Sequence, residues 1–354
     1  MSNLKGATNI LEIQNINKSF PGVQALKDVD FSISKGEIHG LIGENGAGKS
    51  TLIKIISGSL PKDSGTMHFD GAEYNPKDPN QALNKGISTV YQELSLCENM
   101  NVAENLLINR HPKRGLLINF KKLNDITLKY LEKFDLDISP TAKVEELPLA
   151  QRELVEILRA ISYQPKLIIL DEPSEPLSKS DTEQLFKLLD DIKNQGTSIL
   201  YISHNISEVL QISNRITVLR DGEKVDTLKQ KEITENQLSN LMVGRDIGDI
   251  YSGVKTNPKE EIVLEVKDLS SGTRVRDANF KLRRGEIFGI AGLVGAGRTD
   301  LALTIFGYRQ PTSGNITVNG KPVNIKSPRD AMDHKIAYLP EDRHLLGLFL
   351  PYTI

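Results

Sequence analysis

The stretch GENGAGKST, residues 43–51, decides the fold. It follows a strand-like run from Glu37 to Ile42 and opens a helical stretch from Ser50 to Ile56. In this context the pattern predicts a loop whose backbone N–H groups surround phosphate oxygens, with the positive end of a helix dipole behind them. The alternative is a glycine-rich turn that only looks like this pattern, and the strand-to-helix context disfavours it. The residues expected to bind nucleotide here are Gly43, Glu44, Asn45, Gly46, Ala47, Gly48, Lys49, Ser50 and Thr51.

Two side chains of this loop have separate expected roles. Lys49 is expected to contact the β- and γ-phosphates, and the hydroxyl of Ser50 is expected to ligate Mg²⁺. The sequence therefore predicts ATP and Mg²⁺ as the ligands.

A second apolar run, Leu167 to Leu170, ends in the carboxylates of Asp171 and Glu172. A buried strand ends in this way when its C-terminal tip reaches a ligand crevice. Asp171 is predicted to hold the magnesium, and Glu172 to accept a proton from the attacking water or to orient it. Such a strand is common by itself, and the phosphate loop is what favours the catalytic interpretation.

Two further residues follow strand-like runs and are candidates for the same site. His204, after Ile199 to Ile202, could bond the γ-phosphate and couple it to Glu172, although a lone histidine after a strand is more often structural. Gln92, after Ser88 to Tyr91, could contact Mg²⁺ and the water, and its alternative is an exposed loop glutamine.

The chain repeats itself at an offset of 249 residues. The segment 35–38 recurs as 284–287, and the glycines of the phosphate loop recur at Gly292, Gly295 and Gly297. Between residues 36 and 93 the offset needs no gap, and 19 of 58 positions are identical, whereas unrelated chains would match at roughly three or four. A repeat of this length indicates duplicated domains.

The repeat and the composition of the segments predict the organisation of the chain. Residues 1–245 form a complete first domain, residues 246–262 a polar linker, and residues 263–354 the front part of a second copy. Interleaved strands and helices indicate an α/β domain with a mainly parallel sheet. Residues 95–160 have no comparable strand signal and are expected to be mostly helical. The predicted strands of the first domain are Leu11 to Ile16, Glu37 to Ile42, Leu167 to Leu170, Ser198 to Ile202 and Arg215 to Leu219.

Bulk properties exclude some classes of protein. The 44 basic and 46 acidic residues give a net charge of -2, and tryptophan is absent, so binding to nucleic acid by bulk charge or stacked aromatics is not expected. A single cysteine, Cys97, excludes an intrachain disulfide. No signal peptide is recognisable, and no window has the roughly eighteen apolar residues of a membrane span. Any membrane role is therefore expected to be peripheral.

The order of phosphate loop, Gln92, a signature segment, Asp171-Glu172 and His204 resembles that of an ABC transporter ATPase, a P-loop NTPase. Within that superfamily the chain is similar to sugar-importer subunits with two fused ATPase domains, a group that includes an autoinducer-2 importer. Three segments carry this likeness: GENGAGKST, Met242-Val243-Gly244-Arg245, and Tyr338-Leu339-Pro340-Glu341-Asp342-Arg343.

The resemblance implies further roles. Antiparallel β and helical subdomains accompany the parallel sheet, Phe20 stacks on adenine, and residues 95–160 receive a coupling helix of the membrane subunit. It also implies two membrane-embedded permease subunits as partners, a solute-binding protein outside the cell as an indirect partner, and a peripheral place on the cytoplasmic face of the membrane. The implied activity is ATP hydrolysis that energises import of a sugar or sugar-like solute.

The signature segment departs from the superfamily pattern Leu-Ser-Gly-Gly-Gln. Pro148 lacks the serine hydroxyl, and Leu149 and Ala150 add side chains where close phosphate approach favours glycine. We expect a weakened signature that keeps its structural role. The segment is Leu147, Pro148, Leu149, Ala150 and Gln151.

The second loop departs as well, because Arg298 replaces the lysine and Thr299 follows it. Arginine keeps the charge but not the compact ammonium geometry, so nucleotide binding with little or no hydrolysis is expected there. Second copies of three motifs would lie near residues 396, 420 and 453, beyond Ile354. Since the family pairs each loop with the signature of the other domain, we expect this chain to bind MgATP and to hydrolyse it slowly alone.

Two other functions compete with the importer ATPase. One is a catalytically incompetent nucleotide-binding fragment. The other is a soluble ABC ATPase that acts on nucleic acid or ribosomes, which the short, roughly neutral linker disfavours. The locally basic segment from Arg110 to Arg114, with Lys121 and Lys122, is interpreted as a solvated face rather than a dedicated anion site.

Overall fold

The computed structural model describes residues 9–92, 94–175, 177–244, 258–292 and 295–340, together with Gly347 and Phe349. Its contacts divide the chain into two compact units, residues 1–250 and 251–354. The division lies within the expected linker, residues 246–262, and residues 245–257 are outside the described part.

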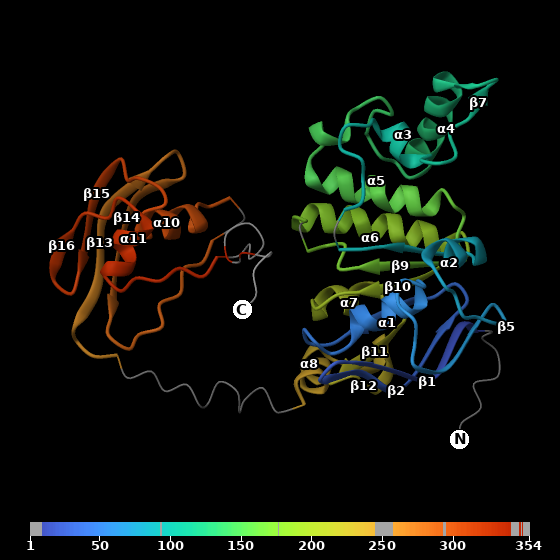
Figure 1. Ribbon diagram of the computed structural model, residues 1–354, viewed down its shortest axis with the longest axis horizontal. Helices are drawn as coiled ribbons and strands as arrows, with labels where there is room; N and C mark the ends of the chain where they lie inside the picture. The colour runs from blue at the N-terminus through green and yellow to red at the C-terminus, as the bar shows by residue number, and fades with distance from the viewer. Residues whose placement is uncertain are drawn as a thin grey trace. The chain divides into compact units, whose positions relative to one another are not determined.

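A six-stranded sheet with the order β12-β11-β3-β10-β9-β6 forms the centre of the first unit (Figure 1). Five of its strands are parallel, and β12 pairs with β11 in the antiparallel sense. Every residue of β3 and β10 is buried, as expected of strands covered on both faces. The strands are β3 (Ile38–Ile42), β6 (Ile87–Val90), β9 (Leu167–Asp171), β10 (Ser198–Ile202), β11 (Arg215–Arg220) and β12 (Glu223–Lys229).

An antiparallel sheet with the order β2-β1-β4-β5 accompanies the central sheet. Its strands are β1 (Asn9–Phe20), β2 (Val23–Ser34), β4 (Ser64–Phe69) and β5 (Ala72–Glu73). Buried residues of this sheet, such as Ile13 and Leu26, share one core with Leu52 and Ile56 of the first helix. All five strands predicted from apolar runs are therefore confirmed. Four lie within β1, β9, β10 and β11, and the fifth, Glu37 to Ile42, starts one residue before β3.

Helices cover the central sheet and connect its strands. The helix α1 starts at Lys49, one residue before the predicted start, and α6 begins with a capping box between Ser178 and Asp181. These helices are α1 (Lys49–Ile56), α2 (Pro79–Lys85), α6 (Lys179–Asn194), α7 (Ile206–Ile212) and α8 (Glu235–Val243), with short 3-10 helices at Val144–Glu146 and Gln230–Glu232. In the described part of the chain, no helix combines the length and apolar character that crossing a membrane requires.

The insert at residues 95–160 is mostly helical, as predicted, and contains α3 (Val102–Leu106), α4 (Phe120–Lys133) and α5 (Leu149–Ile161). It also contains a small hairpin of β7 (Lys113–Arg114) and β8 (Leu117–Ile118) that the sequence did not indicate. Figure 1 shows this hairpin beside α3 and α4, at the end of the first unit away from β1 and β2.

The second unit repeats the antiparallel part of the first. Its sheet has the order β14-β13-β15-β16, and its helix α10 starts 249 residues after α1. The close approach at Gly65 is repeated too, because a Cβ at Gly65 or Gly314 would lie 2.4 Å from a carbonyl oxygen of the first strand. The elements are β13 (Ile262–Ser271), β14 (Val275–Arg283), α10 (Arg298–Ile305), β15 (Ser313–Val318), β16 (Lys321–Val323) and α11 (Pro328–Asp333).

One apolar run of the second unit does not repeat the structure of the first. At the offset of the repeat, residues 287–291 correspond to β3, but they do not form a strand. β3 is hydrogen-bonded on both sides by β10 and β11, and the described residues of the second unit form no strands in those places. Ile287 is therefore 74% exposed, and Phe288 stacks on Phe280 with ring centroids 5.2 Å apart.

Candidate functional site

Four neighbouring parallel strands bring the predicted site residues to one edge of the sheet. In the sheet order β3-β10-β9-β6, the carboxyl ends of these strands carry the loop 43–51, His204, Asp171 with Glu172, and Gln92. Because carboxyl ends of parallel strands lie at the same edge, residues far apart in the chain meet there. The strand order thus gathers the site.

The loop 43–51 has the backbone shape that a phosphate requires. Gly46 and Gly48 have φ values of 88° and 100°, which non-glycine residues rarely adopt. A Cβ at Gly43 would lie 2.3 Å from the carbonyl oxygen of Leu219. Among the residues described, no side chain caps the start of α1 and no acid lies in its first turn, so its backbone N–H groups suit an anion.

Lys49 lies within this loop and is only 6% exposed. Its Nζ donates to the carbonyl oxygens of Gly43 at 2.7 Å and Glu44 at 3.2 Å, which leaves one of its three N–H donors for a ligand. Burial lowers the pKa of Lys49, while the charges of Glu172 and Asp171 act in the opposite direction. A phosphate beside Nζ would satisfy both the third donor and the buried charge.

Asp171 ends β9 with a carboxylate that suits a cation. Burial and the charge of Glu172 raise the pKa of Asp171 to about 6, with Lys49 and Lys54 opposing this. A bound cation would reverse the rise by stabilising the carboxylate. The described residues contain no cluster of three His, Cys, Asp or Glu side chains that could hold a metal. Asp171 and the exposed residue Ser50 are therefore the groups that would hold a magnesium ion, whose other ligands would be water and phosphate oxygens.

Glu172 and His204 lie in contact, with His204 Nδ1 3.1 Å from Glu172 Oε2. Glu172 has a φ of 53°, in the left-handed region, and its N–H donates to the carbonyl oxygen of Ile202 at 2.9 Å. Strained backbone of this kind is common at functional sites and points to a fixed carboxylate position. The side chain of Glu172 is largely buried, whereas that of His204 is half exposed.

Glu208, on α7, is a functional candidate that the sequence analysis missed. Its carboxylate accepts hydrogen bonds from the hydroxyls of Tyr201 (3.0 Å), Ser174 and Ser203 (3.4 Å) and from Asn205 Nδ2 (2.9 Å). These donors lie on the segments that carry Glu172 and His204. The sequence signal was the pair Asn205 and Glu208, which has the spacing of a capping box.

Gln92 lies just after the end of β6 and bonds a neighbouring loop. Its Nε2 donates to Oε2 of Glu175 at 2.7 Å, and among the described residues no hydrogen bond joins it to Asp171 or Glu172. Glu175 is a second residue that the sequence analysis did not select, because the contact joins segments 83 residues apart.

Phe20, at the end of β1, is 43% exposed. Its hairpin packs on the phosphate loop, because a Cβ at Gly48 would lie 2.7 Å from the carbonyl oxygen of Ala25. The exposed aromatic ring of this hairpin is available to stack on a planar base.

The signature segment opens α5. Pro148 is the N-cap residue, Leu149 is exposed, and Leu147, Ala150 and Gln151 are half buried. Arg152 fixes the segment by donating to the carbonyl oxygens of Leu147 and Glu145. Within the described ranges no hydrogen bond or ion pair joins residues 147–151 to residues 43–51.

The second loop resembles the first in backbone but not in side chains. Gly295 and Gly297 have φ values of 83° and 87°, whereas Gly292 and Arg298 are exposed and Thr299 is half buried. Asp300, in the first turn of α10, pairs with Arg309 at 2.6 Å and Arg274 at 3.5 Å. A carboxylate thus lies at the start of α10, where α1 has none.

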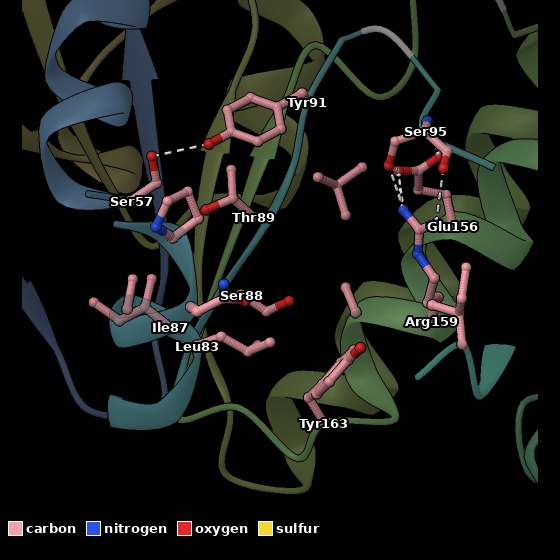
Figure 2. A pocket seen from close by; sticks show the side chains of 16 residues that line it. Ser57, Leu83, Ile87, Ser88, Thr89, Tyr91, Ser95, Glu156, Arg159 and Tyr163 are labelled. Carbon is pink, nitrogen blue, oxygen red and sulfur yellow. Dashed lines mark hydrogen bonds and ion pairs between the residues drawn. The ribbon is translucent and has the colours of Figure 1, made fainter. Parts of the chain in front are cut away.

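A groove of about 350 Å³ lies between the central sheet and the helical insert. Figure 2 shows Ser57 and Tyr91 on one side and Ser95, Glu156 and Arg159 on the other, with Tyr163 below. Glu156 Oε2 and Oε1 accept from the N–H and the hydroxyl of Ser95 at 2.9 and 2.7 Å, and Arg159 bonds both residues. The segment after Gln92 is therefore tied to α5.

The loop 43–51 opens a helix at the carboxyl edge of a parallel sheet, and the Asp-Glu pair lies at the end of β9, two strands away from β3. Together these features define a P-loop nucleotide-binding protein. The family model "ABC transporter" matches residues 26–175 and 275–349. The chain belongs to the ABC transporter family.

Relatives and solved structures agree with this family. The chain is 42% identical to the galactose/methyl galactoside import ATP-binding protein MglA of Fusobacterium nucleatum, over 99% of this chain and 69% of that protein. It is 42% identical to the protein of that name from Clostridium perfringens, over 98% and 67%. It thus spans about two thirds of their length. The ADP conformation of an ATP-binding cassette of an ABC transporter is similar at a TM-score of 0.58 and 30% identity, covering 70% of this chain and 99% of that one.

Proposed function

We propose that this chain is the ATP-binding and ATP-hydrolysing subunit of an ABC importer for a sugar. Relatives that align with almost the whole chain are named galactose/methyl galactoside import ATP-binding proteins. The observation that carries the proposal is the buried Lys49 inside the loop 43–51, facing the charges of Asp171 and Glu172.

In this proposal the first unit binds MgATP, with Phe20 against adenine and the loop around the phosphates. Lys49 holds the β- and γ-phosphates, while Ser50 and Asp171 hold Mg²⁺, which supplies positive charge to the phosphate oxygens when bound. Gln92 reaches the metal and the water after it leaves Glu175.

Hydrolysis forms a bond between a water oxygen and the γ-phosphorus and breaks the bond to the β–γ bridging oxygen. Glu172 accepts the proton of the water, and His204, in contact with that carboxylate, contacts the γ-phosphate. The segment 147–151 closes weakly over a nucleotide, and the loop with Arg298 binds nucleotide with little turnover.

The groove between sheet and insert is proposed to receive a helix of a permease subunit. Its lining joins the residues after Gln92 to α5, so a helix seated there would act on both the metal-binding segment and the signature. The subunit would then lie peripherally on the cytoplasmic face of the membrane, with two permease subunits as direct partners.

The test is binding of ATP to the purified chain, by equilibrium dialysis with and without Mg²⁺. The wild type and Glu172→Gln are expected to bind alike, and Lys49→Ala is expected to bind at least about tenfold more weakly because a charged phosphate contact is lost. Ser19→Ala, on an exposed strand end, serves as the matched control. Equal affinity of Lys49→Ala and the wild type would refute the proposed site.

The import role needs a cellular test. A strain that lacks this chain should lose ATP-dependent uptake of radiolabelled galactose or of a related sugar, and the wild-type gene should restore it. Restoration by Glu172→Gln at the wild-type rate would contradict the coupling of hydrolysis to import.

A further inference from the structure

The hairpin β7–β8 and the start of α4 present apolar side chains to solvent. Leu116 is fully exposed at the turn, Leu117 and Phe120 are more than half exposed, and Ile118 is exposed as well. Gly115, with a φ of 66°, makes the tight turn. Turn positions of a hairpin normally carry polar residues, so a leucine there is not explained by folding.

Basic side chains surround this apolar tip. Lys113, Arg114, Lys121 and Lys122 are exposed, and no Asp or Glu occurs between residues 110 and 122. In the ranges that the structure covers, none of these four side chains forms an ion pair. The solvated-face interpretation accounts for the charges but not for the leucines among them.

The base of the hairpin is fixed to the helical insert. The Arg110 guanidinium lies 3.6 Å from the ring centroid of Tyr163 and donates to the carbonyl oxygen of Ser162 at 2.8 Å. The N–H of Asn119 donates to the carbonyl oxygen of Pro112 at 2.7 Å, and its side chain caps α4. The tip is therefore held out from a firm support rather than folded back onto the chain.

We propose that this tip, defined as residues 113–122, inserts into the interfacial region of a bilayer that contains anionic lipids. Exposed leucine, isoleucine and phenylalanine side chains enter the boundary between headgroups and acyl chains, while lysine and arginine contact the anionic headgroups. A single partner, the anionic bilayer, then accounts for both the apolar and the basic side chains of the tip.

Charge disfavours a second copy of the chain as the partner of this surface. Two copies meeting through the tip would place four positive charges opposite four others with no acid among them. Tyr163, which holds the base of the hairpin, also lines the groove proposed for the permease helix. The link between the tip and the permease groove rests on the proposed function, whereas membrane binding of the tip does not.

The test is co-sedimentation of the full chain with vesicles, either of phosphatidylcholine alone or of phosphatidylcholine mixed with phosphatidylglycerol. Binding is expected only to the anionic vesicles and should fall as salt is raised. The double variant Lys121→Glu/Lys122→Glu should weaken binding at least tenfold, since each adsorbed basic residue is worth about fivefold. The double variant Leu116→Ser/Leu117→Ser should also weaken it at least tenfold, since burial of one leucine side chain is worth roughly tenfold or more.

Matched controls separate the tip from other surfaces. Ile287→Ser removes an exposed apolar side chain of the second unit, and Lys231→Glu reverses an exposed charge elsewhere on the first. Both should bind vesicles like the wild type. The proposal is overturned by equal binding to neutral vesicles, by loss of binding in Ile287→Ser, or by hairpin variants that bind normally. If the hairpin variants bind vesicles normally but assemble poorly into the detergent-solubilised transporter, the tip contacts a protein partner instead.

Discussion

Replacing Glu37 by glutamine is expected to destabilise the first unit by about 3 kcal/mol at neutral pH. Glu37 directly precedes β3, and its carboxylate is buried. Arg215 donates to this carboxylate from Nη2 at 2.7 Å and from Nε at 3.0 Å. The N–H of Ser34 donates to it at 2.7 Å, and the ring of His39 lies 3.1 Å away. Arg215 also donates to the carbonyl oxygen of Ser32, so this cluster ties β2 to β11.

The magnitude follows from the pKa of Glu37. Burial alone would raise the pKa of this carboxyl, but hydrogen bonds from His39 and Arg215 outweigh burial and lower it from 4.5 to about 2. Each pKa unit corresponds to about 1.4 kcal/mol, so the ionised form favours the folded state by about 3 kcal/mol. Because the folded pKa lies below the unfolded one, this stability is fully present above pH 4.5. It is lost as the pH falls toward about 2.

The measurement is urea unfolding of the wild type and the variant at pH 7 and at several values down to pH 2.5. The difference between the two proteins should shrink as the pH falls. Glu223→Gln is the matched control, because its pair with Lys27 is short, at 2.5 Å, but about half exposed, and exposed pairs contribute little. A Glu37→Gln variant as stable as the Glu223→Gln control at pH 7, or a difference independent of pH, would refute the reasoning.

Three further outcomes are expected. Glu172→Gln keeps ATP affinity and lowers single-turnover hydrolysis by about 10²- to 10⁴-fold; an unchanged rate would remove Glu172 from its role. Phe20→Trp gives the chain its first tryptophan, whose fluorescence should change on addition of MgATP, whereas Val23→Trp, across the hairpin, should respond less; identical responses would argue against stacking at residue 20. Glu208→Ala leaves the buried hydroxyl of Tyr201 without its carboxylate and should cost about 1–3 kcal/mol in thermal unfolding and slow hydrolysis; a stable variant of normal rate would contradict a positioning role.

The phosphate loop and the two carboxylates were predictable because their signals are local. The glycine spacing of residues 43–51 prescribes the backbone turn, and an apolar run that ends in Asp171 and Glu172 prescribes a buried strand with two carboxylates at its C-terminal end. Parallel pairing then brings the two together, because β3 and β9 both pair with β10. The contact between Glu172 and His204 needed no further information.

Contacts between side chains of distant loops could not be predicted in the same way. Gln92 contacts Glu175, and Glu208 accepts hydrogen bonds from hydroxyls of two segments, only because the strand order brings these loops together. The left-handed backbone of Glu172 has no sequence signature, since that conformation is unfavourable for glutamate and depends on its surroundings. The two-residue strands of the hairpin at 113–118 are too short for any periodic signal.

The two units show which structural features the repeated sequence reproduces and which it does not. The helix α10 begins at the same repeat position as α1 because the glycines before it prescribe the turn locally. A strand has no such autonomy, since its hydrogen bonds belong to its neighbours, and residues 287–291 lack the neighbours that β10 and β11 give to β3 within the described chain. A Cβ at Gly43 would lie against the carbonyl oxygen of Leu219 in β11, whereas a Cβ at Gly292 would contact only side chains of its own loop. Lys49 is therefore buried, whereas Arg298 is exposed. Within the described residues, this difference in burial follows from the strands that flank β3 but not residues 287–291, as well as from the replacement of lysine by arginine.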